Sequence, residues 1–111
     1  MIQLSRKKKI ILAENALLAR VYDLILNKET AEDERIKLVE FKNAVENGKD
    51  FELETMKLAR ELRLLALSKF KNKKNLSPEV GKLYMDISST GFFKAELGRG
   101  LIALSGMLGN H

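Results

Sequence analysis

The sequence contains no cysteine and no tryptophan, a single proline, and a single histidine, His111, which is the last residue. Without cysteine the chain can form no disulfide, which agrees with a reducing compartment. The lack of cysteine and the lone terminal histidine also exclude a Cys–His nucleophile pair and the common kinds of zinc site. We therefore expect no metal, no cofactor and no enzymatic activity, and we expect the protein to act by binding a partner.

Long apolar runs are also missing. Residues 100–110 are uncharged but too few and too rich in glycine to span a bilayer. The basic run at residues 6–9 is followed by an apolar stretch that Glu14 and Asn15 end too early for a signal peptide. These features favour a cytoplasmic protein. The basic run is then a solvated helix start or, alternatively, an electrostatic anchor at the inner membrane face.

The length and composition suit one globular domain. The 111 residues are 45% hydrophobic and 32% charged, which is ordinary for a folded domain with one core. The net charge of +5 is a modest excess for this size. A positive charge is compatible with two classes of partner, nucleic acid and an anionic membrane face. The positions of the charges, more than their total, distinguish these two classes.

Four segments show apolar residues at three- and four-residue spacing, which predicts an all-α fold. The first covers about residues 5–27, the second runs from Thr30 as N-cap to Gly48, the third covers about residues 50–69, and the fourth runs from Ser77-Pro78 to Gly91. The links at residues 28–30, 48–50 and 70–76 are short. Short links favour antiparallel neighbours, so we expect an antiparallel up-down four-helix bundle over residues 1–91.

The third segment is apolar on more than one side. Leu58 and Leu65 belong to one row, whereas Leu53, Leu64 and Leu67 lie on other sides of the predicted helix. A helix of this kind is usually flanked by several neighbours, so we expect it at the centre of the bundle.

Residues 92–111 form a glycine-rich C-terminal tail. This tail is expected to pack on the bundle or to be partly mobile, and in the second case its apolar residues would form a recognition element. Its candidate contact residues follow Gly91 closely: Phe92, Phe93, Lys94 and Arg99.

The expected topology brings two charged groups together, because the first and third links lie at the same end of an up-down bundle. The acidic group is Glu29, Glu32, Asp33 and Glu34, and the basic group is Lys69, Lys71, Lys73 and Lys74. Because the opposite charges of these two groups partly cancel, this arrangement disfavours nucleic-acid binding. The lysines are then a solvated helix end, complementing the helix dipole, or a contact surface for an acidic or membrane-proximal partner.

Glu14 is a charged residue inside the apolar stripe of the first helix, between Ile11 and Leu17. A carboxylate in this position should be paired or have a raised pKa. We interpret Glu14 as a structural polar residue, at the rim or paired with a cation of a neighbouring helix. The alternatives are a partner contact or an acid, and a lone carboxylate supports chemistry only weakly.

Three motifs together resemble a known family. They are Leu76-Ser77-Pro78-Glu79, Leu83-Tyr84, and Thr90-Gly91-Phe92-Phe93-Lys94-Ala95-Glu96-Leu97-Gly98. In combination with the preceding helices they are similar to the enterocin A-type immunity proteins. These give immunity to class IIa (pediocin-like) bacteriocins of Gram-positive bacteria.

The resemblance implies a cytosolic antiparallel four-helix bundle that protects the producing cell. Such proteins are thought to engage the membrane-embedded mannose phosphotransferase permease once bacteriocin has bound it, with specificity in the C-terminal half.

A small basic nucleic-acid-associated or regulatory bundle is the alternative. A helix-turn-helix aligned on Ala44 and Gly48 fails, because Glu54 and Lys57 would occupy its apolar positions.

Overall fold

The computed structural model describes residues 6–88, which form four α-helices and contain no strand. The helices are α1 (Arg6–Leu26), α2 (Glu32–Glu46), α3 (Phe51–Lys71) and α4 (Pro78–Ser88). The all-helical fold class with four helices is therefore confirmed. The tail at residues 92–111 lies outside the described residues.

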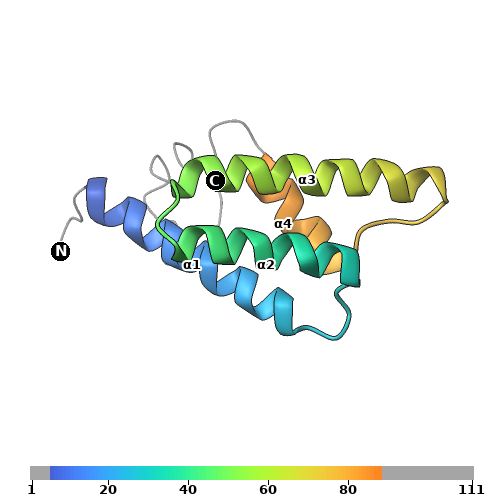
Figure 1. Ribbon diagram of the computed structural model, residues 1–111, viewed down its shortest axis with the longest axis horizontal. Helices are drawn as coiled ribbons and strands as arrows, with labels where there is room; N and C mark the ends of the chain where they lie inside the picture. The colour runs from blue at the N-terminus through green and yellow to red at the C-terminus, as the bar shows by residue number, and fades with distance from the viewer. Residues whose placement is uncertain (1–5, 89–111) are drawn as a thin grey trace, which may run out of the picture.

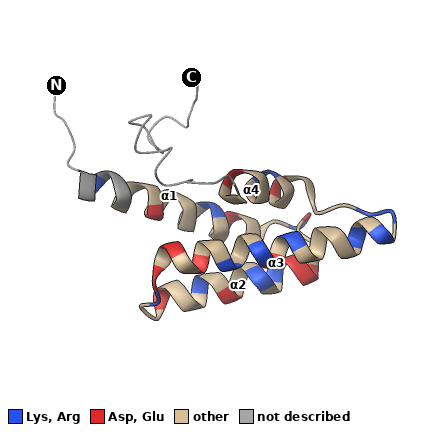
Figure 2. Ribbon diagram, turned by 90° about the horizontal axis from the view of Figure 1, so that it is seen from above, with Lys and Arg blue, Asp and Glu red and all other residues tan. Residues whose placement is uncertain are grey.

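The four helices form two layers. α2 lies between α1 and α3 and packs against both, and α4 packs against α3 (Figure 1). Figure 2 shows α1 and α4 on the same side of the layer formed by α2 and α3. An ion pair between Arg20 of α1 and Asp86 of α4, 2.8 Å long, joins the first and last helices.

One hydrophobic core holds these helices together. Burial of aliphatic side chains, which removes apolar surface from water, makes the largest favourable contribution to the stability of the fold. Phe41 of α2 and Phe51 of α3 meet edge to face, with ring centroids 5.5 Å apart. The buried apolar members of the core come from all four helices: Leu17, Val21, Leu24, Leu38, Phe41, Leu58, Leu62, Val80, Leu83 and Ile87.

The expectation that the third helix lies at the centre of the bundle is wrong. Leu58 and Leu62 of α3 face the core, but Leu53, Leu64 and Leu67 are all more than half exposed. Periodicity identifies apolar faces without saying which neighbour covers them, and within residues 6–88 nothing covers the outer face of α3.

The start of α2 differs from the sequence prediction, whereas the start of α3 agrees with it. The residue before α2 is Ala31, which provides no side-chain cap. Thr30 is one position too early, and its hydroxyl instead donates to the carbonyl of Leu24 at 2.7 Å. The carboxylate of Asp50 accepts from the backbone N–H of Leu53 at 2.9 Å and so caps α3 at the residue where the predicted segment begins.

Two helices end in the same hydrogen-bonded motif. After α2, Gly48 adopts a φ of 88°, and Lys49 N–H donates to the Ala44 carbonyl at 3.0 Å. After α3, Lys73 adopts a φ of 59°, and Lys74 N–H donates to the Lys69 carbonyl at 2.8 Å. Both are Schellman caps, in which glycine is the favoured left-handed residue. The glycine end at Gly48 was predicted, but α3 runs two residues beyond its predicted end at Lys69.

Candidate partner-binding surface

Glu34, in the first turn of α2, is a completely buried carboxylate, with 0% of its surface exposed. Its two oxygens accept from the backbone N–H of Ser77 at 3.1 and 3.2 Å. It also forms an ion pair with Lys69 of α3. A buried charge is tolerated only when it is paired and hydrogen-bonded in this way. Glu34 therefore ties the end of α3 and the start of α4 to α2.

Lys69 supplies the positive charge of this contact. Its side chain is 15% exposed, and its ammonium lies 3.0 Å from Asp33 in addition to its contact with Glu34. Burial by itself would lower the pKa of Lys69, but the hydrogen bonds and charges of Glu34 and Asp33 outweigh it and leave the pKa raised. Lys69 is held in its charged form and is engaged within the fold.

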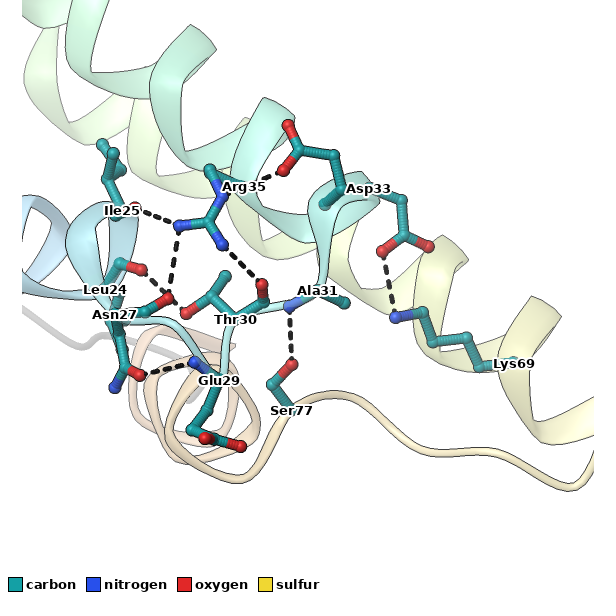
Figure 3. Close-up of polar contacts among 11 residues, drawn as sticks. Leu24, Ile25, Asn27, Glu29, Thr30, Ala31, Asp33, Arg35, Lys69 and Ser77 are labelled. Atoms are coloured by element: carbon teal, nitrogen blue, oxygen red, sulfur yellow. Dashed lines mark hydrogen bonds and ion pairs between the residues drawn. The ribbon is translucent and has the colours of Figure 1, made fainter.

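Arg35 completes the structure beside this pair by holding the link between α1 and α2 (Figure 3). Its guanidinium donates to the carbonyls of Ile25, of Asn27 at 3.3 Å and of Thr30 at 2.7 Å. The hydroxyl of Ser77 accepts from Ala31 N–H at 2.9 Å and brings the two links together. We call Asp33, Glu34, Arg35, Lys69 and Ser77 the polar cluster.

The polar cluster confirms that the acidic residues after the first link lie beside the basic end of the third helix. Lys69 differs in its surroundings from the other lysines of the predicted contact surface. Lys69 is mostly buried and neutralised by Asp33 and Glu34, so it serves the fold and offers little to a partner. Sequence reasoning placed the charges together but did not separate the internal lysine from the external ones.

The external lysines are Lys71, Lys73 and Lys74. All three are exposed, and none takes part in an ion pair with another described residue. Figures 1 and 2 both show the C-terminal end of α3 and the start of its link to α4 projecting beyond the ends of α1 and α2. Phe70, which the sequence analysis missed, is 74% exposed on this projection. Its position outside the core-facing side of the α3 helical wheel could have indicated from the sequence that it is exposed.

Glu14 has the raised pKa that one of its sequence interpretations required. Burial raises the pKa of its half-buried carboxyl, and the negative charges of Asp50 and then Glu52 raise it further. Among the described side chains, which leave out those of residues 6, 7, 9 and 10, no cation forms an ion pair with it. The neighbouring charges that act on Glu14 come from two acidic residues near the start of α3.

The remaining predicted contact residues, Phe92, Phe93, Lys94 and Arg99, lie outside the described residues. In the part of the chain that the structure covers, no cluster of acidic or histidine side chains could hold a metal ion. None of the four helices is both long and apolar enough to cross a membrane.

Comparison with known families identifies the family of the chain. The model of the bacteriocin immunity protein family matches residues 12–91. The chain belongs to this family. The match runs from α1 through α4, so it includes the polar cluster and the external lysines of this immunity protein. It ends just before Phe92. No curated protein and no solved structure gives a significant match to this family member.

Proposed function

We propose that this immunity protein protects a bacteriocin-producing cell by binding, from the cytosolic side, the membrane receptor that the bacteriocin occupies. The receptor is the mannose phosphotransferase permease, and the bacteriocins belong to class IIa. The protein acts stoichiometrically and without catalysis. The antiparallel up-down order of its helices is part of the proposal, and it is supported by the α1–α2 and α2–α3 links, after which the chain runs back beside the preceding helix (Figure 1).

The family match over residues 12–91 is the observation that carries this proposal. The distribution of charge supports it further. The polar cluster neutralises Lys69 internally, whereas Lys71, Lys73 and Lys74 remain exposed on the projecting end of α3. Cations presented in this way steer and orient a partner of opposite charge.

We place the receptor contact on Lys71, Lys73 and Lys74 together with Phe92, Phe93, Lys94 and Arg99 from the tail. The two groups offer cationic and aromatic side chains, and these residue types are suited to electrostatic recognition and to anchoring in apolar pockets. Glu14 and Lys69 are assigned to the fold rather than to this contact.

The proposal is tested by expressing the full chain in a sensitive Gram-positive strain and measuring growth inhibition by a panel of class IIa bacteriocins. We expect the inhibitory concentration of at least one bacteriocin to rise. Replacing Lys71, Lys73 and Lys74 together by glutamine should abolish this protection while the helical circular dichroism is unchanged.

A matched variant with Lys28, Lys49 and Lys82 replaced by glutamine loses the same charge from other exposed positions and should still protect. Absence of protection across the whole panel, with normal expression, would refute the proposal. Equal loss in both triple variants would place the contact elsewhere.

A further inference from the structure

The outer face of α3 carries an unusual share of exposed apolar surface. Five large apolar side chains lie on it, each between 51% and 74% exposed: Leu53, Met56, Leu64, Leu67 and Phe70. On a helix that turns by about 100° per residue they fall within an arc of about 120°. This arc lies roughly opposite the core residues Leu58 and Leu62. The face is therefore a continuous stripe rather than scattered exposed residues.

Cations are interleaved with the apolar residues of this stripe. Arg60, Arg63 and Lys71 share the same arc, are exposed, and make no ion pair within the described part of the chain. Between Met56 and Lys71 the only acidic residue is Glu61. Glu61 points away from the stripe and pairs with Lys37 of α2 at 3.1 Å. From Met56 to Lys71 the stripe therefore carries apolar and cationic side chains and no acid, whereas the exposed Glu52 shares the arc but precedes this segment.

The stripe continues onto the projecting end of α3. Leu67 and Phe70 lie close to the helix end, directly before Lys71, Lys73 and Lys74 (Figures 1 and 2). In this orientation the apolar tips and three lysines can reach a surface that the rest of the fold does not touch.

Charge excludes a second copy of the chain as the favoured occupant. Antiparallel pairing of two α3 stripes about their midpoint would set Arg60 against Arg63, and parallel pairing would set each arginine against itself. In both arrangements the central arginines meet like charges, at a cost in binding, and in the antiparallel one the exposed Glu52 could pair with Lys71 only at the two ends. The favoured occupant provides negative charge along the face from Met56 to Lys74.

We propose that the outer face of α3, from Met56 to Lys74, docks on an anionic lipid bilayer. Lipid phosphates supply the distributed negative charge, and the boundary with the acyl chains accepts leucine, methionine and phenylalanine tips. Arginine and lysine can extend their charged ends to the headgroups from the same face. A bilayer is also fluid, so it requires no groove on the protein. This inference rests on the proposed function, because both use the external lysines.

Flotation of the full chain with vesicles tests the inference without any receptor. We expect binding to vesicles of phosphatidylglycerol mixed with phosphatidylcholine, weakening at high salt, and little binding to phosphatidylcholine alone. Replacing Lys71, Lys73 and Lys74 by glutamine should weaken partitioning roughly 100-fold. Replacing Leu67 and Phe70 by serine should weaken it roughly tenfold or more.

Two controls keep the test specific to this face. The Lys28, Lys49 and Lys82 triple glutamine variant matches the charge change, and Leu26→Ser with Ile36→Ser matches the apolar change on α1 and α2. Both should bind vesicles nearly as well as the parent chain. Equal losses in control and stripe variants would overturn the inference.

Two other results would also overturn it. One is failure to bind anionic vesicles while protection in cells is intact, which would leave the receptor proposal standing and make the stripe a protein contact. The other is a dimer in sedimentation that disappears on replacing Leu67 and Phe70 while vesicles are not bound. Vesicle binding without protection would instead support the lipid surface and count against the proposed function.

Discussion

The two ends of the fold hold charge in different ways. The α1–α2 and α3–α4 links meet at the first end, and the α2–α3 link lies at the second. At the first end Glu34 is completely buried and is satisfied by Lys69 and by Ser77 N–H. At the second end Glu14 is half-buried, and its pKa is raised by burial and by the charges of Asp50 and Glu52. Burial alone therefore does not decide what a carboxylate does; its tertiary partners do.

The same two ends differ in how their helices stop. α2 ends with Gly48 in the left-handed position, and α3 ends with Lys73 in the equivalent position. A side chain at this φ costs conformational energy that glycine avoids. The end that carries the polar cluster thus also accepts local strain, and it does so at one of the exposed lysines. Local strain of this kind is often retained where a side chain has a function.

The largest effect is expected from Glu34→Gln. The change leaves Lys69 without its buried counter-charge and should lower the free energy of unfolding by about 3 kcal/mol. Urea denaturation measures this loss. Glu32→Gln is the control on the same turn of α2, because the Glu32 side chain is 76% exposed and pairs only with Arg35. It should cost less than about 0.5 kcal/mol. Similar costs for both variants would contradict a special role for the buried pair.

Substitutions at the two helix C-termini should change the free energy of unfolding by intermediate amounts and in opposite directions. Lys73→Gly should raise the free energy of unfolding by about 0.5–1 kcal/mol by relieving the left-handed strain. Gly48→Ala should lower it by about 1 kcal/mol. No atom lies within 4 Å of a Cβ built at Gly48, so this cost is conformational and not steric. Thermal unfolding of both variants compares the two ends directly. Destabilisation by Lys73→Gly would show that the lysine side chain contributes more than its backbone costs.

The smallest effect is expected at the acidic end, from Glu14→Gln. The raised pKa of Glu14 means that the folded chain binds this proton more tightly than the unfolded chain does. The charged form therefore reduces stability at neutral pH; the reduction fades as the pH falls through the raised pKa and is gone below the ordinary carboxyl pKa. Glu14→Gln should stabilise the protein by a few tenths of a kcal/mol (about 0.5 at most) at pH 7 and by nothing at acidic pH. Denaturation curves at several pH values, with the exposed Glu29→Gln as control, check this sign. A gain that persists at acidic pH would point to a cause other than charge.

Local signals in the sequence were sufficient for most of the secondary structure. Apolar periodicity predicted four helices, Asp50 and Pro78 marked helix starts, and Gly48 marked an end. These features work because capping and helical periodicity depend on residues within one or two turns. Where two local solutions compete, as with Thr30, the hydroxyl could satisfy either helix, and the sequence prediction chose the wrong one.

Contacts between distant residues were decided only by the tertiary structure. Glu34 reaches Lys69 and Ser77 across 35 and 43 positions of sequence. The charge pattern indicated that these groups would meet, but not that Lys69 would be internal and Lys71, Lys73 and Lys74 external. Likewise, the apolar residues of α3 were visible in the sequence, but only packing could leave half of them exposed. The sequence by itself determined which segments are helical and which residues are apolar or charged, because those properties are local. Whether a side chain is buried, paired or exposed depends on which distant residues pack against it, and only the tertiary structure decides that.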